Sequence, residues 1–161
     1  MKHVISALVE NKAGVLAHIS GLFSARGFNI DSLAVGETED PRFSRMTIVV
    51  DGDDAILEQV RKQLSSVIDV VKVEDFSDQS YVERDLMLMK VKCPPEKRSE
   101  VIHLVDTFRG DTIDVGRRRL TIQLVGTEQK IEAFIQLMRP YGIVEMARTG
   151  RVALSRSSRQ K

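Results

Sequence analysis

The residues of this chain best suited to binding chemistry form a short turn near the N-terminus. Asn11 and Gly14 bound an Asn-x-x-Gly sequence between an apolar run at residues 3–9 and a helical pattern that starts at Val15. A helix start leaves its first backbone N–H groups without intrahelical partners, and these groups favour an anion. No basic cluster and no nucleotide-type glycine loop surrounds the turn. The anion that it suits is therefore a small carboxylate, such as that of an amino acid.

Two interpretations of this turn remain open. On its own, the turn fits an ordinary strand-to-helix connection better, with an N-cap and a convenient glycine. In the alternative, Asn11 is a capping side chain and the backbone amides around Gly14, Val15 and Leu16 receive a carboxylate, since a glycine lets the ligand approach the backbone closely.

A second pair of residues favours the ligand interpretation. Asn29 and Ile30 open the next predicted strand, and in a fold of this kind that point can face the Asn-x-x-Gly turn of a neighbouring copy. Asn29 offers hydrogen bonds to an ammonium or carboxylate group, while Ile30 and Val35 offer an apolar wall.

Catalytic and metal chemistry find little support in the sequence. His3, His18 and His103 have no Cys, Asp or Glu at ligand or triad spacing, and Cys93 precedes two prolines at a strand end. Phosphate-binding glycine loops are absent, and residues 51–54 lack the ligand ladder of a calcium loop. We therefore expect no catalytic residue, no metal site and no cofactor on this chain.

Composition bounds the class of protein. The chain has 161 residues, of which 42% are hydrophobic and 29% charged, which is typical of one globular domain or two small ones. No apolar run reaches the roughly 18 residues of a membrane span, and no signal-peptide pattern opens the chain. A single cysteine fits a reducing cytoplasm, which is the expected location.

Charge is distributed unevenly between the two halves. Residues 1–80 carry 8 Lys and Arg against 13 Asp and Glu, a net of −5, and residues 81–161 carry 16 against 10, a net of +6. The basic half suits nucleic acid or an acidic protein surface, although chance composition would give the same numbers. RNA binding is disfavoured, because aromatic residues are only 5% of the chain and the central strands offer no stacking platform.

The periodicity of apolar residues predicts a repeated order of elements. In the first half, strands at about 2–9, 28–37, 43–50 and 68–76 alternate with helices at about 14–26 and 54–65, the second capped by Asp53. In the second half, strands at about 86–93, 111–115, 118–125 and 143–154 alternate with helices that end near 108 and 139. The fold class is therefore α+β, with two tandem ferredoxin-like βαββαβ domains whose antiparallel sheets carry their helices on one face.

The two halves share a short sequence similarity, which is called the sequence echo below. The segments 26–31 and 109–114 share Arg, Gly, Ile and Asp, and Gly27 and Gly110 are predicted to end the helices before them. The halves differ at the opening turn, because the second has Cys-Pro-Pro-Glu at residues 93–96, where proline offers no N–H group and Glu96 would repel a carboxylate. Only the first copy is expected to bind a ligand.

The first strand has apolar residues on both faces, with Val4 and Leu8 on one and Ile5, Ala7 and Val9 on the other. The helices of such a sheet cover one face only, so the other face is expected to lie against the second domain, another subunit or a partner.

The first half resembles an ACT domain, a small-molecule sensing module of amino-acid metabolism, and the whole chain resembles the regulatory small subunits of acetohydroxyacid synthase (acetolactate synthase). The resemblance covers residues 2–156. It rests on segments spread along both halves, of which those in the second half are the more specific: 11–16, 22–30, 44–48, 82–86, 108–115 and 147–150.

The resemblance implies a domain layout and a partner. It assigns residues 2–77 to an ACT domain that binds the effector, 78–83 to a linker, 84–156 to a C-terminal ferredoxin-like domain and 157–161 to a tail. The chain would have no chemistry of its own. It would activate a catalytic large subunit that carries thiamine diphosphate, magnesium and FAD, and it would confer feedback inhibition by valine in branched-chain amino-acid biosynthesis.

The resemblance also implies a homodimer formed through the ACT domains, with the effector between them. The effector-binding residues would be Asn11, Lys12, Ala13, Gly14, Val15 and Leu16 of one protomer and Asn29 and Ile30 of the other. A free-standing amino-acid sensor and a tandem RNA-binding module remain as alternatives. The preference for valine over leucine or isoleucine stays open, because one methylene changes binding by only about 1–3 kcal/mol.

Overall fold

The computed structural model describes residues 1–157 and divides the chain into two compact units. Unit 1 contains residues 1–82 together with the C-terminal segment from Arg151, and unit 2 contains residues 83–150. The first half forms β1 (Lys2–Glu10), α1 (Val15–Arg26), β2 (Asn29–Glu37), β3 (Phe43–Asp51), α2 (Asp54–Ser65) and β4 (Val70–Asp75). The second forms β5 (Tyr81–Lys92), η1 (Pro95–Lys97), α3 (Arg98–Thr107), β6 (Asp111–Val115), β7 (Arg119–Gly126), α4 (Glu128–Met138), η2 (Arg139–Tyr141), β8 (Ile143–Arg148) and β9 (Val152–Ser155).

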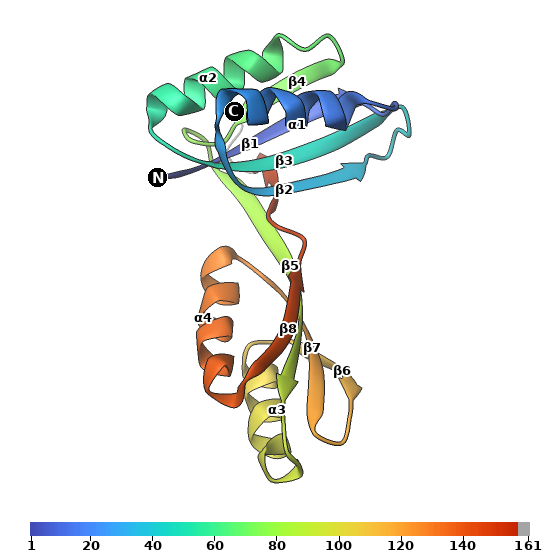
Figure 1. Cartoon of the computed structure of the whole chain (residues 1–161), viewed down its shortest axis with the longest axis vertical. Helices are drawn as coiled ribbons and strands as arrows, with labels where there is room; N and C mark the ends of the chain where they lie inside the picture. Colours follow the sequence, from blue (N-terminus) through green and yellow to red (C-terminus); the bar gives the residue numbers. More distant parts are fainter. Residues whose placement is uncertain (158–161) are drawn as a thin grey trace. The chain divides into compact units, whose positions relative to one another are not determined.

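Unit 1 is built on an antiparallel sheet of strand order β2-β3-β1-β4, with α1 and α2 on one face (Figure 1). Alternate residues of β1 and β3 point to that face and pack against Ile19 of α1 and Leu64 of α2. Burial of each such large apolar side chain contributes about 1.5–3 kcal/mol. The helix α2 begins as the sequence predicts, because the Asp53 carboxylate accepts a hydrogen bond of 2.9 Å from the Ile56 amide.

The opposite face of the unit 1 sheet is partly covered by the end of the chain itself. Val4 of β1 and Val49 of β3 form a small buried cluster with Phe76 and with Ala153 of β9. Val4, on the second face of β1, is therefore covered by β9 of the same chain and does not need another subunit to bury it.

Unit 2 repeats the plan with the strand order β6-β7-β5-β8 and with α3 and α4 on one face (Figure 1). Its core brings Met89 of β5 and Ile122 of β7 against Val101 of α3 and Phe134 of α4, all fully buried. Two antiparallel ferredoxin-like units in tandem confirm the predicted α+β fold class.

Two local predictions in the second half were wrong. A single strand was expected at 143–154, but Gly150, at φ 80°, lies in the break between β8 and β9, which pairs with β5. The strand expected from residue 86 begins at Tyr81.

The predicted cap at Gly110 was also wrong, and with it the alignment of the echo. The left-handed residue after α3 is Arg109, at φ 59°, whereas after α1 it is Gly27, at φ 68°. The amides of Phe28 and Gly110 make the equivalent bonds to Phe23 and Val105, so the two segments correspond with a shift of one residue. Gly110 is needed for another reason: a Cβ there would meet the Gln123 carbonyl at 3.0 Å.

The predicted tail at 157–161 lies outside the described residues except for residue 157. Within the described part of the chain, no helix is long and apolar enough to cross a membrane.

Candidate functional site

The turn between β1 and α1 leaves the start of the helix open. Gly14 is the N-cap residue, at φ 88° and ψ −13°, and no side chain caps the helix. A Cβ built at Gly14 would have nothing within 4 Å. The Val15 amide makes a long hydrogen bond of 3.5 Å to the Lys12 carbonyl. The amides that follow it in the first turn of α1 have no intrahelical partners by the geometry of any helix, so the turn presents hydrogen-bond donors.

Asn11 does not cap the helix, and its predicted capping role was wrong. Its side-chain amide donates to the Pro41 carbonyl at 3.0 Å, and its backbone amide donates to the Arg42 carbonyl at 2.7 Å. Both acceptors belong to the loop between β2 and β3. Asn11 therefore holds that loop against the β1–α1 turn, and the donors of α1 stay available.

Lys12 is already neutralised within unit 1. Its ammonium lies 2.8 Å from the Asp69 carboxylate and 3.0 Å from that of Glu10. The hydrogen bond from Lys12 lowers the pKa of the Asp69 carboxyl, and the bonds to Asp69 and Glu10 raise the pKa of Lys12. The positive character of the turn thus comes from its backbone rather than from this side chain.

The other residues of the turn differ in whether their side chains are buried or exposed. Val15 is buried in the core of unit 1, so only its backbone can face a ligand, whereas Ala13 is exposed and the side chain of Leu16 is 46% exposed. Leu16 is thus an apolar group at the surface beside the open amides.

Asn29 and Ile30 lie at the other end of the sheet. Glu10, next to the turn, pairs with Phe43 at the start of β3, whereas Asn29 pairs with Asp51 at its end. Eight residues of strand separate these positions, which corresponds to about 26 Å. Within one chain, the two sets of predicted site residues do not meet.

The corresponding turn of unit 2 has a different chemistry. Pro94 takes an extended conformation, Pro95 opens η1, and no residue there has a positive φ. Cys93 is buried, and burial raises the pKa of its thiol. The prolines cannot donate, so only the turn of unit 1 has a helix start with open amides and a left-handed glycine.

One cluster of charged side chains in unit 2 could not be predicted from the spacing of residues in the sequence. The Arg148 guanidinium donates to the Asp85 carboxylate at 2.7 and 3.0 Å and to that of Glu132 at 2.8 Å. The side chain of Asp85 is 2% exposed, and Thr149 also binds it, at 3.4 Å. Two of the segments that carry the family resemblance, 82–86 and 147–150, therefore meet in this ion pair.

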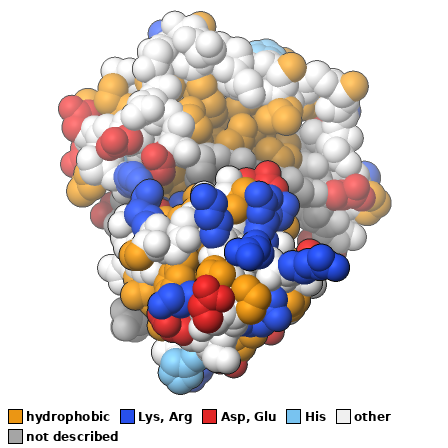
Figure 2. All heavy atoms as spheres, turned by 60° about the horizontal axis from the view of Figure 1, so that its bottom comes forward, with side chains coloured by type: hydrophobic (Ala, Val, Ile, Leu, Met, Phe, Trp, Pro, Cys, Tyr) orange, Lys and Arg blue, Asp and Glu red, His pale blue; other side chains and the backbone are white. Residues whose placement is uncertain are grey.

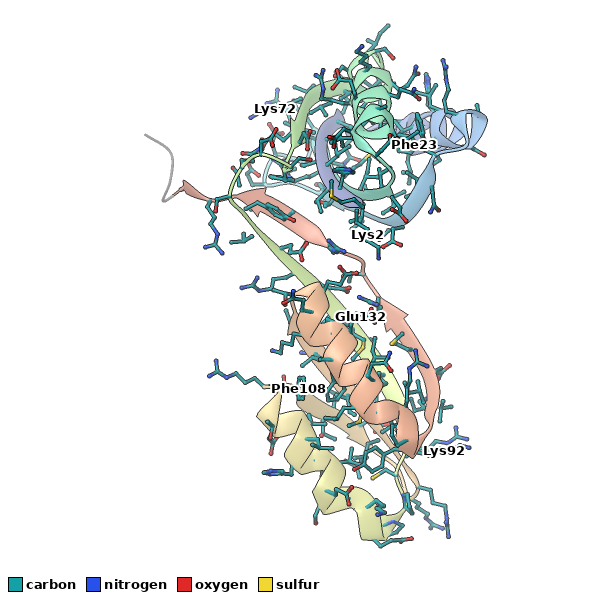
Figure 3. All side chains as sticks on the ribbon, turned by 90° about the vertical axis from the view of Figure 1, so that its left-hand side faces the viewer. Lys2, Phe23, Lys72, Lys92, Phe108 and Glu132 are labelled. Atoms are coloured by element: carbon teal, nitrogen blue, oxygen red, sulfur yellow. The ribbon has the colours of Figure 1, made fainter. Side chains whose placement is uncertain are left out.

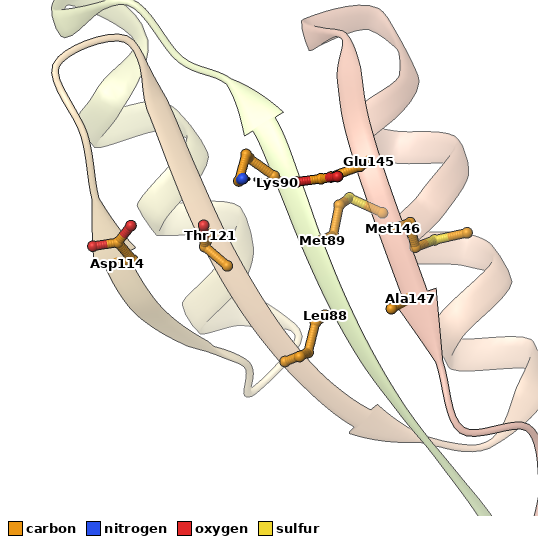
Figure 4. A pocket seen from close by; sticks show the side chains of 8 residues that line it. All are labelled: Leu88, Met89, Lys90, Asp114, Thr121, Glu145, Met146 and Ala147. Atoms are coloured by element: carbon orange, nitrogen blue, oxygen red, sulfur yellow. Dashed lines mark hydrogen bonds and ion pairs between the residues drawn. The ribbon is translucent and has the colours of Figure 1, made fainter.

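The open face of the unit 2 sheet has a depression of about 390 Å³ lined by strands β5 to β8 (Figure 4). Its cation, Lys90, is bound to Glu145 at 2.7 Å. Asp114 adds a negative charge, so the depression offers no unpaired cation to a carboxylate.

The histidines have structural or solvent-exposed positions. The ring of His3 is buried and lies within hydrogen-bond distance of Ser77 and the Gly52 carbonyl, while His18 and His103 are exposed. Across residues 1–157, no group of three His, Cys, Asp or Glu side chains could hold a metal ion.

Comparison with known proteins adds independent evidence. A family model for the small subunit of acetolactate synthase matches residues 84–157, and one for an AHAS small subunit-like ACT domain matches residues 5–72. An Archaeoglobus fulgidus protein named "Probable acetolactate synthase small subunit" is 54% identical over 160 residues, which cover 99% of this chain and 100% of the relative. The acetolactate synthase small subunit of Aquifex aeolicus is 49% identical over 156 residues, 96% of this chain and 81% of its own.

A solved structure agrees with these relatives. The crystal structure of the acetolactate synthase small subunit from Thermotoga maritima superposes with a TM-score of 0.89 at 44% sequence identity, and the match covers 97% of this chain and 98% of that one. Sequence, fold and both halves of the chain therefore agree: this protein belongs to the family of acetolactate synthase small subunits.

Proposed function

We propose that this chain activates the catalytic large subunit of acetolactate synthase and makes it sensitive to valine. In this proposal, valine binds between the ACT units of two copies in a homodimer. The amides of α1 at Gly14, Val15 and Leu16 receive the valine carboxylate, while Asn29 and Ile30 of the other copy complete the site. Thiamine diphosphate, magnesium and FAD belong to the catalytic subunit.

The observation that carries the proposal is the separation of the two residue sets. The turn before α1 and Asn29 lie at opposite ends of the sheet, about 26 Å apart along β3, so a site made of both needs a second copy. The strand β2, which begins at Asn29, is an edge strand of nine residues. Such an edge has unpaired backbone groups that can pair with another strand.

Antiparallel pairing of the β2 edges of two copies would bring Asn29 of one copy toward the turn before α1 of the other. A two-fold axis near Leu33, the middle residue of β2, would set Asn29 of one copy beside Glu37 of the other. Glu37 pairs with Ser44, next to the Phe43 that pairs with Glu10. Asn29 would then approach the end of the sheet where the partner's Asn11 turn lies. Leu33 and Val35 are 37% and 45% exposed, which leaves apolar surface for such a contact.

Regulation follows from a site shared by two protomers. Valine can shift an equilibrium only if it binds one arrangement of the complex better than another. A ligand that contacts both copies does so, because a change in their orientation breaks half of its contacts. A coupling of about 1–3 kcal/mol between the effector and catalysis would give useful inhibition.

The first prediction tests the site with Gly14→Asp. No atom lies within 4 Å of a Cβ built at Gly14, although the positive φ there strains any side chain, and the new carboxylate would occupy the position proposed for the carboxylate of valine. We expect calorimetry on the full chain to show at least about a hundredfold loss of valine affinity, in line with about 3 kcal/mol for an unpaired buried charge. Catalytic assays of the complex should show activation without feedback inhibition.

The control is Gly21→Asp, at an open and exposed position of α1 that lies outside the proposed site and outside the β2 edge. Retained valine sensitivity in Gly14→Asp would contradict this placement of the site. Titration with leucine and isoleucine in the same experiment decides which effector the pocket prefers. The wider proposal fails if the purified chain neither associates with the catalytic subunit nor changes its activity.

A further inference from the structure

The β6–β7 hairpin of unit 2 presents three consecutive arginines. β6 ends at Val115, Arg117 and Arg118 occupy the turn, and β7 starts at Arg119. All three side chains are exposed, and none has an ion pair with a carboxylate in the part of the chain that the structure describes. The carboxylate of Glu145 is bound to Lys90, and this hydrogen bond, with a smaller contribution from the charge of Arg119, lowers its pKa.

The strand register adds a fourth cation at the same end of the sheet. Lys92, the last residue of β5, pairs directly with Arg119 of β7, and its side chain is exposed (Figure 3). Like charges directly opposite each other in a sheet destabilise it. An anion placed between Lys92 and Arg119 would remove this repulsion.

Neighbouring residues hold the arginine turn in place. The Arg98 guanidinium donates to the carbonyls of Gly116 and Arg117, both at 3.1 Å. The Cys93 amide donates to the Arg118 carbonyl at 2.8 Å. The backbone that carries the cations is therefore ordered before any partner arrives, which lowers the entropic cost of binding.

The shape and composition of this surface fit a protein partner. Lys92, Pro94, Arg118 and Arg119 line a depression of about 330 Å³, and Figure 2, which brings this end of the chain forward, shows Lys and Arg side chains gathered on it. Ile113 and Val115 of the edge strand β6 are 49% and 54% exposed. Arginine beside exposed apolar groups is typical of protein interfaces, whereas small-molecule pockets enclose most of their ligand.

We propose that this hairpin surface, defined by Lys92, Ile113, Val115 and Arg117–Arg119, docks an acidic surface of the catalytic subunit. The inference rests on the proposed function and assigns the docking role to unit 2, while unit 1 binds the effector. The partner's carboxylates would lie against Arg118, Arg119 and Lys92, and an apolar group would cover Ile113 and Val115. Unit 2 itself carries a small excess of positive charge, with 12 Lys and Arg against 10 Asp and Glu in residues 83–150.

The test compares full-length chains for binding to the purified catalytic subunit by calorimetry over a range of salt concentrations. R118E/R119E should weaken association at least about tenfold at low salt and flatten its salt dependence, because reversed charges now repel the acidic surface. R118K/R119K should retain the affinity. The matched control, R109E/K130E, changes the net charge equally at the opposite end of the sheet and should bind within about twofold of the unaltered chain.

Several outcomes would overturn the docking proposal while leaving the proposed function intact. One is an unaltered chain that binds and a reversed variant that binds equally well. Another is a change in the mass of the free small subunit in R118E/R119E, measured by light scattering, which would make the hairpin a contact between copies. A third is tight binding of single-stranded RNA, by fluorescence anisotropy, that the reversal abolishes. Valine titration of each variant alone should match the unaltered chain, which shows that unit 1 is intact.

Discussion

The carboxylate of Asp85 is almost fully buried, and its charge is compensated by Arg148. A buried pair of this kind gains little over apolar packing, but the loss of one partner leaves an uncompensated charge. The pair joins the first residues of β5 in unit 2 to the last residue of β8, and the Leu86 amide donates to Thr149 beside it. Asp85 and Arg148 are 63 residues apart in sequence, so their ion pair fixes the register of β5 and β8 at this end of the sheet.

At this scale we predict that Arg148→Met destabilises unit 2 by about 3 kcal/mol, the lower end of the range for breaking a buried pair, since Arg148 is 27% exposed. The free energy of unfolding is measured by urea titration with hydrogen exchange of unit 2 amides. Glu132→Gln removes only the exposed arm of the cluster and should cost less than about 1 kcal/mol. Equal effects of the two substitutions would contradict the greater importance of the buried Asp85–Arg148 pair.

A second residue-scale feature is the exposed pair of Lys12 and Asp69 beside the turn between β1 and α1. Because the folded state lowers the pKa of Asp69 and raises that of Lys12, Asp69 contributes stability above its unfolded pKa near 3.8 and loses it as the pH falls through its lower folded value. Lys12 contributes below 10.5 and loses its contribution as the pH rises through its folded value. The pair is therefore intact between these limits.

We accordingly predict that an NMR titration places the pKa of Asp69 below 3.8 in the unaltered chain and returns it toward 3.8 in Lys12→Met. The carboxyl of Glu58, whose pKa is lowered by its hydrogen bond from Arg61 and not by Lys12, serves as the control and should not move. An unchanged Asp69 in Lys12→Met would show that the pair does not form in solution. Valine affinity should stay within about twofold in Lys12→Met, since the backbone supplies the donors.

At the scale of elements, the turns that end α1 and α3 have the same backbone geometry but different residue types at the left-handed position. Both α1 and α3 end with a left-handed residue and a hydrogen bond to the carbonyl five residues earlier, but Gly27 holds that position in unit 1 and Arg109 in unit 2. A residue with a Cβ costs about 1–2 kcal/mol in this conformation. Gly110 stands one position later, where its lack of a side chain allows close packing on β7.

Arg109→Gly should therefore stabilise unit 2 by about 0.5–1 kcal/mol, after the larger entropy of glycine in the unfolded chain is subtracted. Gly110→Ala should destabilise it by about 1–3 kcal/mol, because the methyl group would crowd Gln123, Leu124 and Val105. Urea unfolding of both variants checks the pair. Destabilisation by Arg109→Gly would mean that Gly110, rather than Arg109, takes the left-handed position, as the sequence echo predicts.

At the scale of the whole molecule, unit 1 is discontinuous in sequence. Its sheet comes from the first half of the chain, but Ala153 of β9 completes the buried cluster of Val4, Val49 and Phe76. Ala153 is 4% exposed, whereas its neighbour Val152 is 50% exposed. The last strand therefore stabilises unit 1 although it follows unit 2 in the chain.

Ala153→Asp is expected to destabilise unit 1 by about 2–4 kcal/mol through an unpaired charge in an apolar cluster, with little change in unit 2. Hydrogen exchange resolves the two units, which need not unfold together. Val152→Asp, on the exposed side of the same strand, is the matched control and should change neither by more than about 0.5 kcal/mol. Loss of protection in unit 2 instead would show that β9 belongs with that unit.

Sequence and tertiary structure determined different things. The alternation of β1, the spacing of apolar residues in α2 and the cap at Asp53 were predictable, because strand and helix periods and capping bonds involve residues close in sequence. The repeated order of elements followed from them, and with it the fold class. The position of β9, the binding of Asn11 to the β2–β3 loop and the Asp85–Arg148 pair were decided only by the fold, since each joins residues 30 or more positions apart. Such contacts depend on which surfaces remain to be buried once the sheets have formed, and no local pattern encodes that choice.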